Sequence, residues 1–256
     1  YGKIHLNYDF DQVNVLTSSI EDYDPQMDQQ SLVDGAMARP EGGVTLRELA
    51  KGKDKVVLIA SDHTRPVPSR LLMPLLLQEI RAGNPEADIT ILIATGCHRG
   101  TTKEELVQKF GQEIVANENI YIHDCDEREK LVNIGTLPSG GECEINSLAL
   151  EADLLLAEGF IEPHFFAGYS GGAKAIMPGV STPEAIQANH RMMVSPDAHA
   201  GKLEGNPIRE DIEEAGEICG VDYIVNAVLD EHKHIVYAVA GDVTEAHRDG
   251  CRYLDR

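Results

Sequence analysis

The residues best suited to chemistry fall in three polar loops, each of which follows an apolar run. In the first loop, residues 61–69, the carboxylate of Asp62 and the guanidinium of Arg65 lie between a hydrophobic run and a predicted helix. Asp62 could hold ribose hydroxyls, and Arg65 could bind a carboxylate or a phosphate through two parallel hydrogen bonds. A capped surface loop with an internal Asp–Arg ion pair explains these residues equally well.

The second loop, residues 95–100, places a histidine between two glycines. Gly96 and Gly100 allow the backbone to approach a ligand closely, and His98 lies between them. Imidazole is the side chain whose ordinary pKa suits proton transfer near neutral pH. A single histidine is more often structural than catalytic, but this position makes His98 a candidate for acid–base chemistry.

The third loop begins at residue 158 and combines His164 and Lys174 with glycines and three of the chain's five phenylalanines. It is not a P-loop, because Ala173 stands where that motif needs glycine and Ala175 where it needs a hydroxyl. A lysine in an apolar, glycine-lined setting can have a lowered pKa and act as a nucleophile or covalent anchor. A lysine that pairs with phosphate or caps a helix is the alternative.

The elements that position these loops alternate between strand and helix. Apolar runs typical of strands buried on both faces occur at 55–60, 88–94, 119–123 and 153–157. Helical patterns occur at 69–82, 183–193, 206–218 and 243–254. Runs at 223–229 and 234–240 predict a late β-hairpin. We therefore predict one three-layer, Rossmann-like α/β domain with a mostly parallel sheet, and ligands of such sheets bind at the carboxyl ends of the strands.

Charge and composition exclude several classes of function. The 256 residues include 43 Asp and Glu against 22 Lys and Arg, a net charge of -21, which argues against a nucleic-acid partner and an anionic membrane surface. No apolar run reaches the roughly 20 residues that span a membrane, and no signal peptide opens the chain. Five scattered cysteines without a C-x-x-C pair favour reduced thiols in a cytoplasmic protein. The first residue is not methionine, which suggests a trimmed chain.

A succession of short motifs resembles a known family. The motifs are D-H-T-R-P from Asp62, T-G-x-H-R from Thr95, E-P-H-F-F-A-G from Glu162, S-G-G-x-K from Ser170, P-G at Pro178 and N-H at Asn189. In this order they resemble the nickel-pincer-nucleotide lactate racemases. The resemblance covers residues 1–256 as the amino-terminal domain of that family, and it implies that the family's carboxyl-terminal domain is absent from this chain.

The resemblance implies a role for each site residue. Lys174 would carry the cofactor, a pyridinium-3-thioamide-5-thiocarboxylic acid mononucleotide, through a thioamide, and His190 would be the protein ligand of its nickel ion. His98 and His164 would be the acid–base residues, each with a pKa near neutrality, and Arg65 would bind the substrate. Further cofactor contacts are implied at Asp62, Thr95, Gly96, Gly168, Ser170, Gly171 and Gly172, with the glycines beside the phosphate.

The implied activity is racemisation or epimerisation of a lactate-like 2-hydroxy acid by hydride transfer to the cofactor. Cofactor-biosynthesis proteins and the absent domain would be its partners. One base for each enantiomer explains why there are two histidines. The alternatives are a nucleotide- or sugar-phosphate-binding transferase without nickel and a non-catalytic ligand-sensing module. Anionic ligands entering so acidic a chain would need local cations, for which Arg65, Arg99 and Lys174 are candidates.

Overall fold

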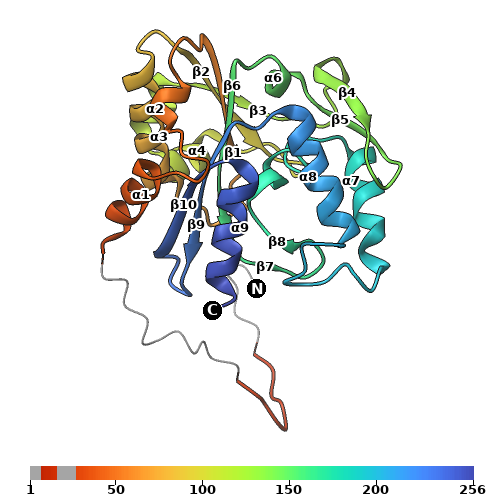
Figure 1. The fold of residues 1–256 in the computed structure, drawn as a ribbon. Helices are drawn as coiled ribbons and strands as arrows, with labels where there is room; N and C mark the ends of the chain where they lie inside the picture. Colours follow the sequence, from red (N-terminus) through yellow and green to blue (C-terminus); the bar gives the residue numbers. More distant parts are fainter. Residues whose placement is uncertain (1–6, 16–26) are drawn as a thin grey trace.

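A six-stranded sheet forms the centre of the computed structural model, which describes residues 7–15 and 27–256 (Figure 1). The sheet contains β1 (Lys55–Ser61), β2 (Asp88–Ala94), β3 (Asn119–Ile122), β6 (Leu154–Ile161), β9 (Tyr223–Leu229) and β10 (Ile235–Gly241), in the order β10-β9-β6-β1-β2-β3. All neighbours are parallel except β9 and β10, which form the predicted late hairpin. The mostly parallel α/β sheet is therefore confirmed.

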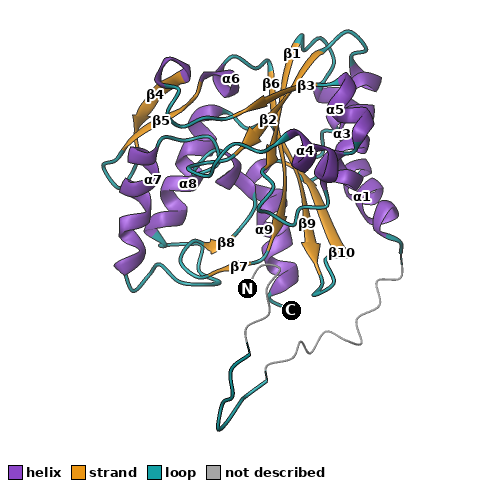
Figure 2. Ribbon diagram, turned by 180° about the vertical axis from the view of Figure 1, so that it is seen from behind, coloured by secondary structure: helices purple, strands orange, loops and turns teal. Residues whose placement is uncertain are grey.

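Both faces of the sheet are buried, which is why its strands are almost continuously apolar. In β1, Val57 and Ile59 belong to one core, and Val56 and Leu58 to the other. Helices α1 (Gln29–Ala38), α2 (Leu46–Leu49), α3 (Ser69–Gly83), α4 (Lys103–Phe110) and α5 (Gln112–Asn117) cover one face (Figure 2). Helices α6 (Ser147–Leu150), α7 (Pro183–His190), α8 (Pro207–Cys219) and α9 (Val243–Leu254) cover the other.

Local sequence signals set the ends of the site-bearing helices. Thr102 and Glu105 form a capping box at the start of α4, and Thr182 caps α7. Asn206 accepts hydrogen bonds from two backbone N–H groups at the start of α8, where Pro207 takes the first helical position. These caps fix where the polar loops end and the helices begin.

Several elements differ from the sequence prediction. Strand β6 continues to Ile161, so residues 158–161 are strand rather than loop, because they keep pairing with β9 as far as Val228. Two antiparallel pairs that we did not predict are β4 (Leu131–Thr136) with β5 (Glu142–Asn146), and β7 (Pro163–His164) with β8 (Gly168–Tyr169). The helical pattern at 183–193 ends as α-helix at His190 and continues as the 3₁₀ helix η3 (Arg191–Val194).

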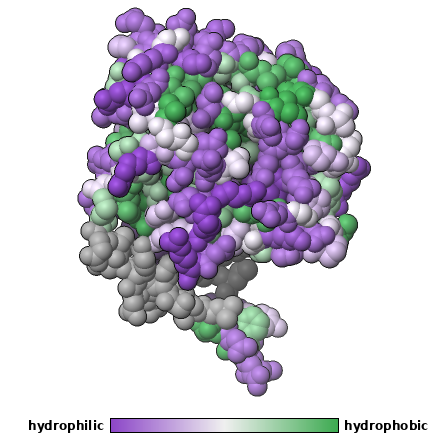
Figure 3. Space-filling model, in the orientation of Figure 1, coloured by the Kyte–Doolittle hydropathy of each residue, from purple (hydrophilic) through white to green (hydrophobic). Residues whose placement is uncertain are grey.

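The carboxyl ends of β1, β2 and β6 lie side by side at one edge of the sheet. Strands β1 and β6 are parallel neighbours, but the chain continues from β1 to β2 on one side and from β6 to β9 on the other, which makes a topological switch point. The surface seen in Figure 3 is mostly hydrophilic, in keeping with the high charge. No helix among the described residues is long and apolar enough to cross a membrane.

Candidate functional site

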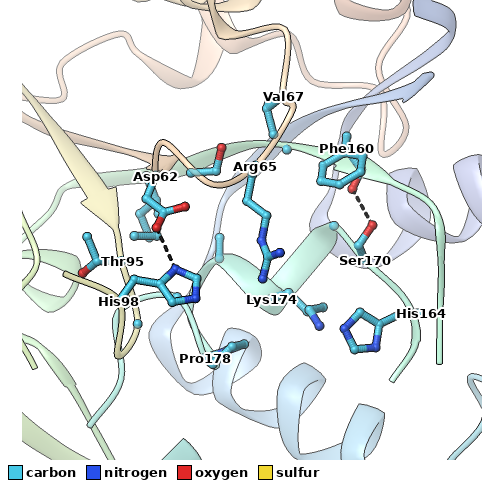
Figure 4. A pocket seen from close by; sticks show the side chains of 18 of the residues that line it. Asp62, Arg65, Val67, Thr95, His98, Phe160, His164, Ser170, Lys174 and Pro178 are labelled. Atoms are coloured by element: carbon cyan, nitrogen blue, oxygen red, sulfur yellow. Dashed lines mark hydrogen bonds and ion pairs between the residues drawn. The ribbon is translucent and has the colours of Figure 1, made fainter. Parts of the chain in front are cut away.

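The carboxyl ends of β1, β2 and β6 surround a cavity of about 420 Å³ (Figure 4). All but one of the residues predicted for the site line it: Asp62, Arg65, Thr95, Gly96, His98, His164, Ser170, Gly171, Gly172, Lys174 and His190. Residues spread over more than half of the chain therefore meet at one place.

A buried carboxylate orients the imidazole of His98. Nδ1 of His98 lies 2.7 Å from Oδ2 of Asp62, and the other carboxylate oxygen accepts hydrogen bonds from the backbone and hydroxyl of Thr64. Burial raises the pKa of Asp62, but the hydrogen bonds from Thr64 and His98 outweigh it and hold that pKa below its ordinary value. Because an ionised carboxylate only accepts, Nδ1 of His98 carries a proton and Nε2 is free to act as a base.

His164 is held in the opposite tautomer. Its Nδ1 accepts a hydrogen bond of 3.3 Å from the backbone N–H of Ala167, so the neutral ring carries its proton at Nε2. Burial, followed by the nearby cations Lys174, Arg209 and Arg65, lowers the pKa of His164 to about 3. This differs from the near-neutral pKa that we expected, because a positive imidazole would be partly desolvated beside three other positive charges.

The two histidines face each other across the cavity. In Figure 4, His98 lies on one side and His164 on the other, and the side chains of Arg65 and Lys174 extend between them. No carboxylate among the described residues forms an ion pair with Arg65, so its guanidinium is available to an anion. The arrangement suits a small carboxylate placed between two proton-transfer groups.

Lys174 belongs to the short 3₁₀ helix η2 (Gly172–Ala175), which follows a glycine turn. Burial, together with the charges of Arg209 and Arg65, lowers the pKa of Lys174 to about 7. No described residue accepts a hydrogen bond from its amine, which lies 6.0 Å from the ring centre of Phe166. A substantial fraction of this amine is uncharged near neutral pH, which is the nucleophilic form.

His190 lies at the end of α7 and presents a free ring nitrogen. Asn189 donates its amide hydrogens to the carbonyl of Ile208 and to Asp211, so its Oδ1 is left to accept from Nδ1 of His190 at 3.1 Å. Nε2 of His190 therefore keeps its lone pair, as a metal ligand requires. The ring also packs edge-on against Phe166, at 4.9 Å between centroids.

Three of the residues predicted to contact the cofactor make contacts that stabilise the fold. The hydroxyl of Thr95 donates to the carbonyl of His123, and that of Ser170 donates to the carbonyl of Phe160. Gly168 does not line the cavity, since a Cβ at this position would lie 2.2 Å from the carbonyl oxygen of Lys202. Contact between Gly168 and the cofactor stays a prediction, with Gly168 outside the set of residues that line this cavity.

Arg99, which we expected to attract anions, is occupied elsewhere. Its guanidinium forms a two-pronged ion pair with Glu105, with N–O distances of 2.6 and 2.9 Å, and it does not line the cavity. The positive charges that face the cavity are Arg65 and Lys174, and Arg209 lies buried behind its wall.

Glu158 is a cavity residue that sequence reasoning did not single out. It lies within β6, which is buried along its whole length, and there its Oε1 accepts a hydrogen bond from Ser69 and its Oε2 has no partner among the described residues. Burial raises the pKa of Glu158, which favours the uncharged acid. A lone carboxyl inside an otherwise apolar strand was the signal that could have identified it.

No group of three potential metal ligands lies together in this cavity among the described residues. Among the described residues, the one cluster of three potential ligands is Asp124, Cys125 and Asp126, which is not part of the cavity. His190 is therefore not part of a preformed cluster of three protein ligands among the described residues.

Comparisons with known proteins agree on the family. The family model described as "Lactate racemase N-terminal domain" matches residues 1–201. The chain is 48% identical over 259 residues to lactate racemase of Thermoanaerobacterium thermosaccharolyticum and 45% identical to that of Lactiplantibacillus plantarum. In both cases 99% of this chain is covered, and the chain spans 61% of the length of the relative.

Solved structures agree with the fold. The apoprotein structure of the lactate racemase from T. thermosaccharolyticum superposes with a TM-score of 0.88 at 50% identity, covering 90% of this chain and 56% of that one. A protein from Thermotoga maritima superposes with a TM-score of 0.73 at 22% identity, covering 91% of this chain and 60% of that one, and shares the fold.

Proposed function

The chain belongs to the lactate racemase N-terminal domain family, and from this membership we propose that it is the cofactor-binding part of a nickel-dependent 2-hydroxy-acid racemase or epimerase. The observation that carries the proposal is that His98 and His164 lie on opposite sides of one cavity, with Arg65 and Lys174 between them. Inversion needs a proton acceptor on each side of the substrate, because the two enantiomers present their hydroxyl groups differently.

The residues present fit the nickel-pincer nucleotide. Lys174 offers an amine that is partly uncharged near neutral pH for covalent attachment, and His190 offers a lone pair at Nε2 for nickel. Phe166 contacts both side chains, so the amine and the imidazole belong to one wall of the cavity. The nucleotide would lie along the backbone of Gly96, Gly171 and Gly172, beside Asp62, Thr95 and Ser170.

Each polar side chain has a task in the proposed reaction. Arg65 would bind the substrate carboxylate, and Nε2 of His98 would take the hydroxyl proton of one enantiomer. His164, once protonated to imidazolium, would donate a proton on the other side, and its neutral form would serve as the base for the opposite enantiomer. The chemistry that the bound nickel pincer would supply is reversible uptake of the substrate's α-hydrogen with its electron pair.

Binding itself would adjust His164. Two of the cations that lower its pKa are Lys174 and Arg65. A thioamide at Lys174 would be uncharged, and a carboxylate bound to Arg65 would offset the second charge. Both changes would raise the pKa of His164 toward the range in which it exchanges protons with substrate.

We further propose that the part of the relatives beyond this match covers the cavity. Phe165 stacks on His164 with 5.0 Å between ring centroids, yet it is 76% exposed at the cavity rim. A large aromatic side chain left in water beside a site is typical of a surface that another domain covers. Turnover would then require that second part, whereas cofactor attachment would not.

Intact mass tests the proposal directly. Protein co-expressed with cofactor-making proteins should carry an adduct and nickel, and Lys174→Ala should carry neither. His190→Ala should keep the organic adduct but lose nickel, which separates attachment from metal binding. Lys103 is an exposed lysine of α4, so Lys103→Ala serves as the control, and this variant should carry the adduct on Lys174 and the nickel as wild type does. An unmodified Lys174 without nickel in the co-expressed protein would favour a transferase or a ligand-sensing module instead.

A further inference from the structure

The backbone between His164 and Lys174 is held by four buried side chains from later parts of the chain. These residues, which we call the clamp, are Asn206, which caps α8, together with Arg209 of α8, Asn226 of β9 and His247 of α9. Each is at most 1% exposed except His247, at 3%. All four lie after residue 201, where the family match ends.

The first half of the clamp binds three carbonyl groups of the loop. Nδ2 of Asn206 donates to the carbonyl of Phe166 at 2.9 Å. Nε of Arg209 donates to Ala167 at 3.1 Å, and its Nη2 donates to the carbonyl of Tyr169. Irregular backbone buried at this depth needs such partners, because an unpaired buried carbonyl destabilises the fold.

The second half binds the glycine turn directly before the lysine. His247 donates from Nε2 to the carbonyl of Ser170 at 2.8 Å, and the N–H of Gly172 donates to Oδ1 of Asn226 at 2.8 Å. A carbonyl only accepts, so the neutral ring of His247 must carry its proton at Nε2. Five of the seven residues from 166 to 172 thus form a backbone hydrogen bond with the clamp.

The clamp side chains pack so closely against the turn that they leave room only for glycine there. Gly171 and Gly172 adopt φ angles of +78° and +59°, which favour glycine. A Cβ at Gly171 would lie 2.6 Å from Oδ1 of Asn226, and one at Gly172 would lie 2.9 Å from the ring of His247. The clamp side chains fill the space that the missing side chains leave, so the turn has little freedom to shift.

Arg209 brings a positive charge close to the site. Its nearest carboxylate, Glu213, lies 4.0 Å away, and its Nη1 has no hydrogen-bond partner among the described residues. A buried guanidinium without a close counter-ion is destabilising, so its retention calls for a local reason. After burial, the positive charge of Arg209 is the largest cause of the lowered pKa of Lys174.

We propose that Asn206, Arg209, Asn226 and His247 are positioning residues that fix the place and direction of the Lys174 amine in the cavity. The functional meaning rests on the proposed role of Lys174 as the attachment lysine. The claim that these residues hold the Lys174 amine in place does not rest on that role, because it concerns the chain without cofactor. It extends the site into α8, β9 and α9, beyond the matched residues 1–201.

The test compares two substitutions at one position. In His247→Gln, the side-chain amide can still donate to Ser170, whereas His247→Leu removes the donor. Ile80→Ala, in the fully buried part of α3 on the opposite face of the sheet, is the control for general loss of stability. Two readouts are needed: hydrogen exchange of peptide 166–176 relative to β1, and the pH midpoint for acetylation of Lys174 by acetic anhydride.

We expect His247→Leu to speed the relative exchange of 166–176 at least about tenfold, on the scale of one lost buried hydrogen bond. The acetylation midpoint of Lys174 should rise toward 10.5, because a looser loop admits water. His247→Gln should lie close to wild type in both readouts, and Ile80→Ala should leave the relative exchange unchanged.

The proposal is overturned if His247→Leu has the same relative hydrogen exchange and acetylation midpoint as wild type. It is also overturned if Ile80→Ala changes these two readouts as much as His247→Leu does. If His247→Leu does not fold, hydrogen exchange of the wild-type protein still tests the proposal. The backbone N–H of Gly172 donates to Asn226, so the proposal requires that this amide exchanges slowly. Rapid exchange there overturns the proposal. If the clamp results hold but co-expressed Lys174 never gains an adduct, the proposed function fails and the positioning role stands.

Discussion

Oδ2 of Asp62 lies 2.7 Å from Nδ1 of His98, so a carboxylate at the end of β1 sets the proton position on an imidazole that follows β2. The sequence analysis places Asp62 among the cofactor contacts, with an Asp–Arg ion pair as the alternative, and does not predict its pairing with His98. The pairing arises because β1 and β2 are parallel neighbours in register, with Ser61 opposite Ala94. Residues that follow these two positions must emerge side by side.

Asp62→Asn should reverse the tautomer of His98. The N–H of Thr64 obliges the amide oxygen of the new side chain to stay at the Oδ1 position, so its NH₂ group faces Nδ1 of His98. The ring then keeps its proton at Nε2 and loses its base. We expect kcat of the loaded enzyme to fall on the order of 10²–10⁴-fold.

Imidazole ¹⁵N chemical shifts of the free chain report this tautomer without any cofactor. Asp34→Asn, an exposed position in α1, is the matched control. A His98 ring that stays protonated at Nδ1 in Asp62→Asn would show that the carboxylate does not set the tautomer.

His98→Ala and His164→Ala should each impair both directions of racemisation. One histidine accepts a proton while the other donates, so every turnover uses both. We expect kcat/KM to fall on the order of 10²–10⁴-fold in each variant, and the double variant to lose much less than the product of the two. Polarimetry from each enantiomer measures this, with His232→Ala in the exposed hairpin turn as control. Full activity in either single variant would rule out a two-histidine mechanism.

The amine of Lys174 should react at unusually low pH. Its pKa of about 7, against an ordinary 10.5, predicts half-maximal acetylation near pH 7. Burial is the main cause of the lowered pKa, and the positive charges of Arg209 and Arg65 lower it further. The negative charge of Glu162 raises the pKa of Lys174 in the opposite direction. The neighbouring His164 and His190 have lowered pKa values and are neutral, so they add no positive charge. Arg65→Gln should raise the midpoint, whereas Arg81→Gln in α3 should not. Peptide mass spectrometry measures it, and a midpoint near that of exposed lysines would contradict the prediction.

Lys174 should also make stability depend on pH. Its pKa is lower in the folded chain, so between about pH 7 and 10.5 the unfolded chain binds more protons and the free energy of unfolding rises with pH. Below this window the lysine is charged in both states, and the folded chain bears the full penalty of its burial. Lys174→Met should therefore be more stable than wild type at pH 6.5, by a margin that shrinks toward pH 10. Urea denaturation at several pH values measures the margin, and a constant margin would contradict the assignment.

Sequence patterns predicted the parts of this fold that depend on local periodicity. The runs at β1 and β2 and the capped helices α8 and α9 are examples, as are the three polar loops at one sheet edge. The end of β6 was missed because Glu158 is a charged residue type in a buried strand. Burial of such a group depends on Ser69, far away in sequence, and periodicity carries no information on it.

The clamp was missed for the same reason. Asn206, Arg209, Asn226 and His247 bind backbone groups that lie 40 to 77 residues earlier. Arg209 alone left a local signal, since it falls on the buried stripe of α8 with Ile212 and Gly216. An arginine on such a stripe indicates a buried partner, although it does not identify that partner.

The clamp also imposes an order of events during synthesis. A ribosome adds Lys174 to the chain before it adds Asn206, Arg209, Asn226 or His247. Until α9 exists, the lysine is solvated, charged and no more reactive than its neighbours. The distinctive amine arises only once α9 has docked. A modifying protein that recognises it would thus act on finished domains and pass over nascent chains, so that incomplete molecules would not consume cofactor.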